Sequence, residues 1–134
     1  MKIAHICLSS FYIEGAGYQE NELIREHVET GHDVFVIAST ETYGTDAKLT
    51  YVEPSEFVSA EGARTTRLAY VGWPQKIARK LRIHRGVYQL LEEFQPDAIL
   101  FHSLCGWELL TVARYKRDHP DVLLTLHNVV AHEV

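Results

Sequence analysis

The chain has 134 residues, of which 46% are hydrophobic and 23% are charged. This is close to the commonest length of a single domain, and the composition excludes a disordered or fibrous protein. Thirteen lysines and arginines against 18 aspartates and glutamates give a formal charge of −5. No overall positive field therefore attracts nucleic acid, which argues against a DNA-binding protein.

The two cysteines, Cys7 and Cys105, are too few for the disulfide framework of a small secreted protein. Both lie in apolar stretches, so we expect two buried thiols in a reducing compartment. The amino terminus lacks a signal-peptide pattern, because the short apolar run after Lys2 ends at the polar pair Ser9-Ser10. No apolar run is long enough to span a membrane. These observations predict a cytoplasmic protein.

The first third of the chain has the pattern of a βαβ unit. Residues 3–8 form a short, mostly apolar run that is typical of a strand covered on both faces. Apolar positions at helical spacing predict a helix over residues 18–30, and Gly31 follows where a helix often ends on a left-handed residue. The apolar run 33–38 predicts the next strand, reached by a right-handed crossover.

The rest of the chain continues this alternation after a less regular region. Six further elements are predicted: a short strand over residues 49–52, a core strand over 65–70, a long helix over 75–94 that Gly86 bends or breaks, a strand over 97–101, a helix over 107–117 and a strand over 121–126. Core strands alternating with helices predict a doubly wound, mostly parallel Rossmann-like domain of the α/β class, with the strand order 3-2-1-4-5.

Two histidines each follow a predicted strand. His102 comes after the strand over 97–101, and His127 after the strand over 121–126. Ligand sites of doubly wound folds lie at the carboxyl ends of the strands. Each histidine is therefore a candidate for hydrogen bonding or proton transfer, and the alternative is a histidine bonded to nearby backbone.

The remaining histidine positions do not indicate a metal centre. His5 within the first strand and His32 before the second are expected to be structural. The pairs His27/His32 and His127/His132 are each five residues apart, which is not the spacing of zinc ligands on one helix face. The sequence also offers no cysteine pair, so we expect no metal site.

The segment Gly15-Ala16-Gly17 precedes a predicted helix, where backbone N–H groups can cradle a phosphate. It is an incomplete dinucleotide fingerprint, because Glu20 stands where the third glycine belongs and because six residues separate it from the strand. The alternative is a flexible surface loop.

A cluster of cations lies on ten residues of the predicted helix over 75–94: Lys76, Arg79, Lys80, Arg82 and Arg85. In an otherwise acidic protein this stretch is a candidate to bind an anionic membrane surface or a phosphorylated acceptor. The alternative is a solvated helix face.

The sequence contains, in order, MKIAHICL at residues 1–8, GAGYQEN at 15–21, GHDV at 31–34, PDAILFH at 96–102 and LTLH at 124–127. In this order and spacing the segments resemble the amino-terminal half of a family 4 glycosyltransferase with the GT-B fold. The resemblance implies a retaining sugar transfer from a nucleotide-diphospho-sugar, without a metal or other cofactor. Two Rossmann-like domains face each other across a cleft in such enzymes, and the amino-terminal domain mostly holds the acceptor.

The resemblance also implies roles for individual residues. His127 contacts the donor sugar as the catalytic residue, and Gly15, Ala16 and Gly17 approach the donor diphosphate. The physical expectation agrees, since preorganised N–H groups and a histidine would meet the charge that develops as the diphosphate leaves. The remaining candidates for the acceptor side of the cleft are Ser9, Ser10, Tyr18 and His102.

The resemblance implies that residues 1–134 form one acceptor-side domain. The family's donor-binding carboxy-terminal domain, with its Glu-x7-Glu motif and basic clamp on the diphosphate, is absent from this sequence. We therefore expect no appreciable activity from the chain alone. Two alternatives stay open: a non-catalytic Rossmann-like binding module, and half of a nicotinamide-dependent oxidoreductase in which Glu41 binds the ribose. Phe11, Tyr12 and Tyr18 would offer an exposed surface for dimerisation.

Overall fold

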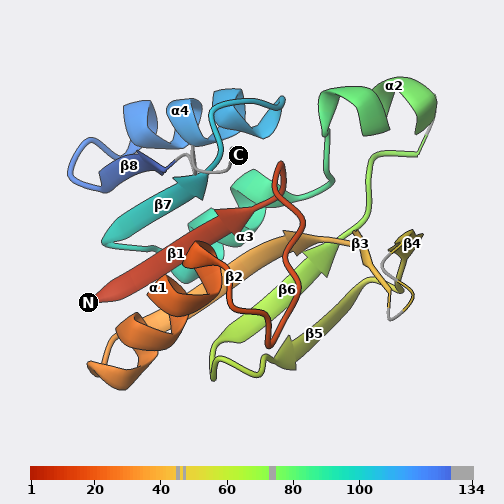
Figure 1. Ribbon diagram of the computed structural model, residues 1–134. Helices are drawn as coiled ribbons and strands as arrows, with labels where there is room; N and C mark the ends of the chain where they lie inside the picture. The colour runs from red at the N-terminus through yellow and green to blue at the C-terminus, as the bar shows by residue number, and fades with distance from the viewer. Residues whose placement is uncertain (45, 47, 73–74, 128–134) are drawn as a thin grey trace.

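The computed structural model describes residues 1–134 apart from 45, 47, 73–74 and 128–134, and a six-stranded sheet forms its centre (Figure 1). The parallel strands of this sheet are β1 (Lys2–Cys7), β2 (Asp33–Ser39), β6 (Arg64–Leu68), β7 (Ala98–His102) and β8 (Leu123–His127). An antiparallel strand, β5 (Ser55–Val58), pairs with β6, so the order is β5-β6-β2-β1-β7-β8. A separate two-stranded sheet contains β3 (Glu41–Tyr43) and β4 (Leu49–Tyr51).

Helices cover both faces of the large sheet. They are α1 (Gln19–Glu29), α2 (Gln75–Leu81), α3 (Val87–Phe94) and α4 (Glu108–Asp118). On one face, Ile24 of α1 packs in a buried cluster with Val36 of β2. On the other, Leu91 of α3 and Val112 of α4 pack in a second cluster with Ile6 of β1. Since successive side chains of a strand point to opposite faces, the central strands are apolar almost throughout.

The order of the parallel strands confirms the prediction, since β6-β2-β1-β7-β8 is the predicted order 3-2-1-4-5. The fold is a doubly wound, Rossmann-like α/β domain. The long helix predicted over 75–94 is broken, because α2 ends at Leu81, α3 begins at Val87, and Gly86 between them has φ +89°. The sequence patterns predicted β4 but neither β3 nor β5.

Figure 1 shows α2 beyond the carboxyl ends of the parallel strands, on the side where the loop after β1 also lies. This edge of the sheet is therefore bordered by the loop after β1, the loop after β7 and α2. Within the part of the chain that the structure describes, none of the helices combines the length and apolar character that a membrane crossing needs.

Candidate functional site

His102 and His127 lie side by side at the carboxyl edge of the sheet, as the last residues of β7 and β8. They are register partners in neighbouring parallel strands, and their Nδ1 atoms are hydrogen-bonded at 3.1 Å. His102 is 3% exposed, whereas His127 is half-buried. The structure thus brings together the two histidines that the sequence placed at this edge.

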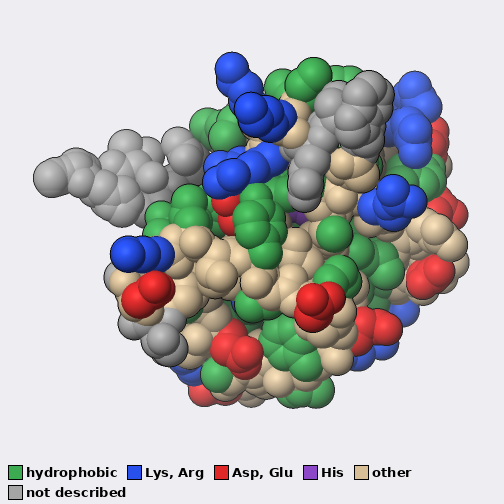
Figure 2. Space-filling view, turned by 90° about the vertical axis from the view of Figure 1, so that its right-hand side faces the viewer, with side chains coloured by type: hydrophobic (Ala, Val, Ile, Leu, Met, Phe, Trp, Pro, Cys, Tyr) green, Lys and Arg blue, Asp and Glu red, His purple; other side chains and the backbone are tan. Residues whose placement is uncertain are grey.

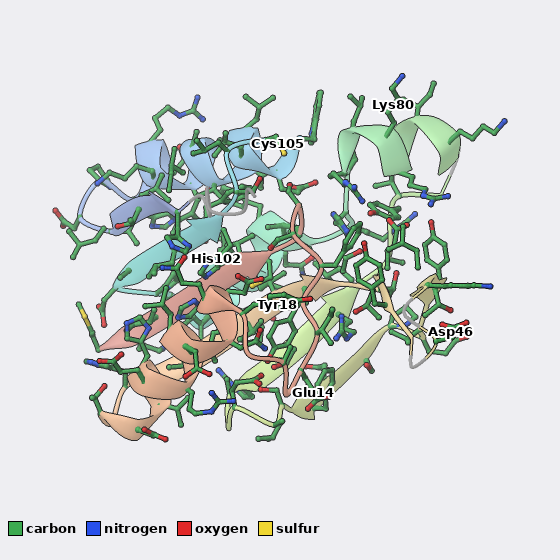
Figure 3. All side chains as sticks on the ribbon, in the orientation of Figure 1. Glu14, Tyr18, Asp46, Lys80, His102 and Cys105 are labelled. Atoms are coloured by element: carbon green, nitrogen blue, oxygen red, sulfur yellow. The ribbon has the colours of Figure 1, made fainter. Side chains whose placement is uncertain are left out.

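His5 connects this pair to α1. Its Nδ1 lies 2.8 Å from Nε2 of His102, and its Nε2 lies 2.9 Å from Nδ1 of His27. The rings of His5 and His102 stack with their centroids 5.1 Å apart, and Figure 3 shows His102 between β7 and α1. His27, His5, His102 and His127 therefore form one continuous hydrogen-bonded series, the histidine row. Two of these residues, His102 and His127, were predicted as site candidates from the sequence, whereas their connection to His5 and His27 was not.

Burial keeps the inner imidazoles of the histidine row neutral. Desolvation, with smaller contributions from His127 and His27, lowers the pKa of His102 to about 3. Desolvation also lowers the pKa of His5 well below its ordinary value, and the neighbouring histidines act in the same direction. The pKa of His27 is lowered as well, first by desolvation and then by His32. At neutral pH these rings are therefore hydrogen-bond donors and acceptors rather than cations.

The Gly15-Ala16-Gly17 loop is fixed by a buried carboxylate, so it is not the flexible surface loop of the alternative interpretation. The Gly15 N–H donates to Oε2 of Glu61 at 2.7 Å, and the Tyr12 hydroxyl donates to Oε1 of the same side chain. The Ala16 N–H donates to the carbonyl of Ile13 at 3.2 Å. Two of the loop's N–H groups are therefore engaged inside the protein, and Gly15 takes φ +80°, a conformation that suits glycine.

The open end of α1 lies next to this loop. Its first backbone bond runs from the Glu22 N–H to the carbonyl of Tyr18 at 3.1 Å, so the N–H groups of the preceding turn have no helical acceptor. The side chain of Tyr18 is 55% exposed here. Glu20 and Glu22 lie in the same first turn and weaken the attraction of the helix end for an anion.

Ser9 joins the loop after β1 to the loop after β7. Its Oγ donates to the carbonyl of Cys105 at 2.7 Å. A Cβ added at Gly106 would lie 2.2 Å from Ser9 Oγ. Ser10 Oγ is buried, and it has no hydrogen-bond partner among the described residues. The prediction of two buried thiols is wrong for Cys105, which is exposed because it lies in this loop rather than in a strand; Cys7 is buried in β1.

The backbone is strained where β7 ends. Ser103 follows His102 with φ +142°, a region that residues other than glycine rarely adopt. Such a conformation costs about 1–3 kcal/mol and persists where neighbouring interactions impose it. Here the Ser103 N–H donates to the carbonyl of His127 at 2.7 Å, which ties the end of β7 to the end of β8. The strained residue thus fixes the separation of the two edge histidines.

The three aromatic residues predicted to form a dimerisation surface do not form a common exposed surface. Tyr12 is fully buried with its hydroxyl on Glu61, because its ring fills the cluster beneath α1. Phe11 is half-buried against Tyr43, whose ring meets it edge-on at 5.5 Å. Tyr18 alone of the three is strongly exposed. The predicted surface is therefore wrong.

The five cations predicted on one helix do not all lie on one helix, because Arg82 and Arg85 come after the end of α2. Arg79 of α2 and Arg82, just beyond it, each place a guanidinium nitrogen 3.0 Å from a carboxylate oxygen of Glu41, which is 1% exposed. Tyr70 donates its hydroxyl to Glu41 at 2.7 Å. Arg85 lies in the turn before α3. Glu41 is thus engaged by arginines and buried, which removes it as the ribose-binding acid of an oxidoreductase.

The outer side of α2 presents both cations and apolar side chains. Lys76 and Lys80 are exposed, and so are Ile77, at 55%, and Leu81, at 43%. Figure 3 shows Lys80 projecting away from the sheet, and Figure 2 shows Lys and Arg side chains gathered in the upper half of the face that includes α2, with most acidic side chains below them. A hollow of about 380 Å³ lies between α2, β4 and the loop after β1.

Across the described ranges, no three His, Cys, Asp or Glu side chains are arranged to hold a metal ion. His27 and His32 meet ring edge to ring face with their centroids 5.9 Å apart. His132, the second member of the other histidine pair, lies outside the described residues.

The family model described as a glycosyl transferase 4-like domain matches residues 14–133. The chain belongs to the glycosyl transferase 4-like family. The match includes the glycine loop and three members of the histidine row, His27, His102 and His127. A search of curated proteins found no match.

The histidine row of this glycosyl transferase 4-like domain depends on how distant strands are paired. His5 lies opposite Leu100 in the sheet, so it faces the same side as His102, two residues further along β7. The sequence does contain the signal that histidines occur in three neighbouring strands. Turning this signal into a contact requires the register of β1, β7 and β8, which local patterns do not provide.

Proposed function

We propose that the chain, over residues 1–134, is the acceptor-side domain of a retaining glycosyltransferase that transfers a sugar from a nucleotide-diphospho-sugar. The family match over residues 14–133 carries this proposal, and the place of His127 at the carboxyl edge supports it. A donor-binding domain would face this edge and complete the cleft. Because that domain would supply the contacts that stabilise the leaving diphosphate, the chain alone is expected to be inactive.

In this proposal His127 contacts the donor sugar near the reacting carbon. As the bond to the diphosphate breaks, charge develops on both fragments, and a preorganised hydrogen-bonding group lowers the barrier more than bulk water does. The half-buried setting of His127 supports such a role, since a partly desolvated imidazole interacts more strongly than a solvated one. The proposal assigns no metal or other cofactor to the reaction.

The donor diphosphate is assigned to the glycine loop and the open end of α1. The N–H groups of Gly15 and Ala16 are already engaged, so these residues would shape the approach of the diphosphate. Hydrogen bonds to its oxygens would come from Gly17 and the first turn of α1. Gly17 has open space where a Cβ would lie, which supports close approach of a ligand.

The acceptor is assigned to the neighbouring part of the edge. The Ser10 hydroxyl lacks a partner among the described residues, but it is buried, so it would have to become exposed before it could bond a substrate hydroxyl. Tyr18 offers an exposed ring on which a sugar or an apolar acceptor can pack. Ser9 and His102 are bonded to Cys105 and to other histidines, so they would support the site indirectly.

We also propose that α2 docks the cytoplasmic protein peripherally on an anionic membrane, where it would meet a lipid-borne acceptor. Lysines beside exposed apolar side chains are typical of an interfacial helix, and each cation near an anionic surface contributes about 1 kcal/mol. Lys76, Lys80, Ile77 and Leu81 supply this combination. Arg79 forms an ion pair with Glu41, so substituting the exposed lysines tests membrane binding more directly.

Vesicle flotation tests the docking. Lys76→Gln with Lys80→Gln should abolish binding to vesicles that contain anionic phosphatidylglycerol. The matched control, Lys2→Gln with Arg117→Gln, removes two charges near the opposite edge of the sheet and should leave binding unchanged. Equal losses in the two double variants would show general electrostatic attraction and would refute docking through α2.

Amide NMR tests the sugar-transfer proposal. The ¹⁵N-labelled chain is titrated to millimolar concentrations with UDP-, GDP- and dTDP-linked hexoses, and separately with NADH. We expect one nucleotide sugar to shift the amide signals of Gly17 and His127, whereas NADH should not. Shifts with NADH alone would favour an oxidoreductase, and no shift at either residue with any nucleotide sugar would favour a non-catalytic binding module.

A further inference from the structure

The histidine row joins four elements through three consecutive imidazole–imidazole hydrogen bonds. The bonds run from Nδ1 of His27 to Nε2 of His5 at 2.9 Å, from Nδ1 of His5 to Nε2 of His102 at 2.8 Å, and from Nδ1 of His102 to Nδ1 of His127 at 3.1 Å. His5 is fully buried in the central strand, whereas His27 and His127 at the two ends are half-buried. The row therefore crosses the domain from α1 to the carboxyl edge.

The chemistry of neutral imidazole couples these bonds. Each neutral ring has one N–H donor and one lone-pair acceptor, so a ring bonded at both nitrogens donates on one side and accepts on the other. His5 and His102 are both bonded at two nitrogens. All three bonds must then run in the same direction along the row. Reversing one bond reverses the others and changes the tautomer of every ring.

Two directions are allowed, and each gives His127 a different function. If the bonds run from α1 to the edge, His27, His5 and His102 carry their protons on Nδ1, and His127 carries its proton on Nε2. If they run the other way, the first three carry protons on Nε2, and His127 carries its proton on Nδ1. The Nε2 of His127 has no partner among the described residues, and it is a donor in the first case and an acceptor in the second.

We propose that His102, His5 and His27 are positioning residues that fix the tautomer of His127 and thereby set whether its Nε2 donates or accepts a hydrogen bond. The use of that nitrogen on a donor sugar rests on the proposed function, whereas the coupling along the row does not. His27 is the end of the row on α1, so a change at the helix reaches the edge through bond direction without moving the backbone.

The surroundings of the row favour this arrangement. Both inner rings are buried and uncharged at neutral pH, so they stay in the donor–acceptor form that the coupling requires. The groups around the α1 end are His32 and Glu26, and they act in opposite directions on the charge of His27. A half-made bond in the interior would leave a buried nitrogen unsatisfied, so mixed directions are disfavoured.

Long-range ¹H–¹⁵N NMR of the ¹⁵N-histidine-labelled chain tests the proposal, because it reports the tautomer of each ring. Spectra at pH 8 avoid protonation of a ring with the ordinary pKa of about 6.5. We expect His27, His5 and His102 to share one tautomer and His127 to have the opposite one, since its bond to His102 joins two Nδ1 atoms. The same tautomer in His102 and His127 would overturn the proposal, and this test needs no substitution.

Substitution at the α1 end tests how far the coupling reaches. His27→Leu removes the partner of His5 Nε2, so the balance between the two directions should change and the ¹⁵N signals of His127 should move. His27→Asn restores a group that can donate or accept and should return the signals toward their original values. The matched control, His32→Leu, removes a ring that touches His27 outside the row.

Unchanged His127 signals in a folded His27→Leu chain would overturn the proposal. An equal change in His32→Leu would also overturn it, because packing rather than hydrogen bonding would then control the ring. These readouts contain no sugar ligand. A nucleotide-sugar titration without shifts therefore refutes the proposed function and leaves the coupling intact. If His102 and His127 have the same tautomer, the coupling is refuted and the proposed function is left intact.

Discussion

Replacing Gly106 by alanine probes how tightly the loops after β1 and β7 are joined at the site. Gly106 has φ +97°, and alanine in such a conformation costs about 1–3 kcal/mol. The new Cβ would lie 2.2 Å from Ser9 Oγ, whereas ordinary contact begins at 3.4 Å, so this oxygen must move by more than 1 Å and leave the Cys105 carbonyl. Losing that hydrogen bond adds about 0.5–1.5 kcal/mol. We expect Gly106→Ala to lower the free energy of unfolding by about 2–4 kcal/mol.

Ser9→Ala separates the collision from the backbone strain. Alone it removes the hydrogen bond and should cost about 0.5–1.5 kcal/mol. In the double variant the collision is absent and the bond is already lost, so the total should fall short of the sum of the single losses by about 1 kcal/mol. Urea denaturation followed by tryptophan fluorescence measures all three values. Losses that add within about 0.5 kcal/mol would refute the predicted collision.

Three further predictions concern buried titratable side chains. Glu61→Leu leaves the Gly15 N–H and other donors without an acceptor and should cost about 2–5 kcal/mol in thermal denaturation; an unchanged melting temperature would contradict this. Glu41→Gln should cost about 1–3 kcal/mol, whereas Arg79→Lys at the exposed side of the same pair should cost under about 1 kcal/mol, and equal losses would argue against the buried anchor. Because the pKa of His102 is about 3 in the folded state and about 6.5 when unfolded, the unfolded chain binds more protons between these values, so stability should fall as pH drops through this range. Urea titrations across the range test this, and His102→Gln should flatten the slope.

The parallel strands could be predicted because each is buried on both faces. The apolar run over residues 33–38 forms most of β2, and all but its first residue are buried. β5 could not be predicted in this way, because residues 55–58 are mostly exposed and show no burial pattern. This strand exists through backbone hydrogen bonds to β6, which a local side-chain pattern does not encode.

In the candidate site, too, the residues marked by a local pattern could be predicted, and those brought together by strand pairing could not. His102 and His127 could be placed at the edge because each follows an apolar strand, a local feature of the sequence. The row through His5 could not be predicted, because it depends on the register of strands far apart in the chain. In the same way, Arg82 belonged to a cationic segment in the sequence, and its actual partner is a buried Glu41 that comes 41 residues earlier.

The central position of β1 has a consequence for synthesis of the chain. β2 follows β1 closely, but β7, its neighbour on the other side, is anchored by a bond from the Lys2 N–H to Asp97, 95 residues later. At about 5–20 residues per second on the ribosome, β1 waits for several seconds with one edge unpaired. An open edge on an apolar strand is a template for association with other chains. β1 is thus made well before its second neighbour, and during translation its open edge exposes the domain to association with other chains.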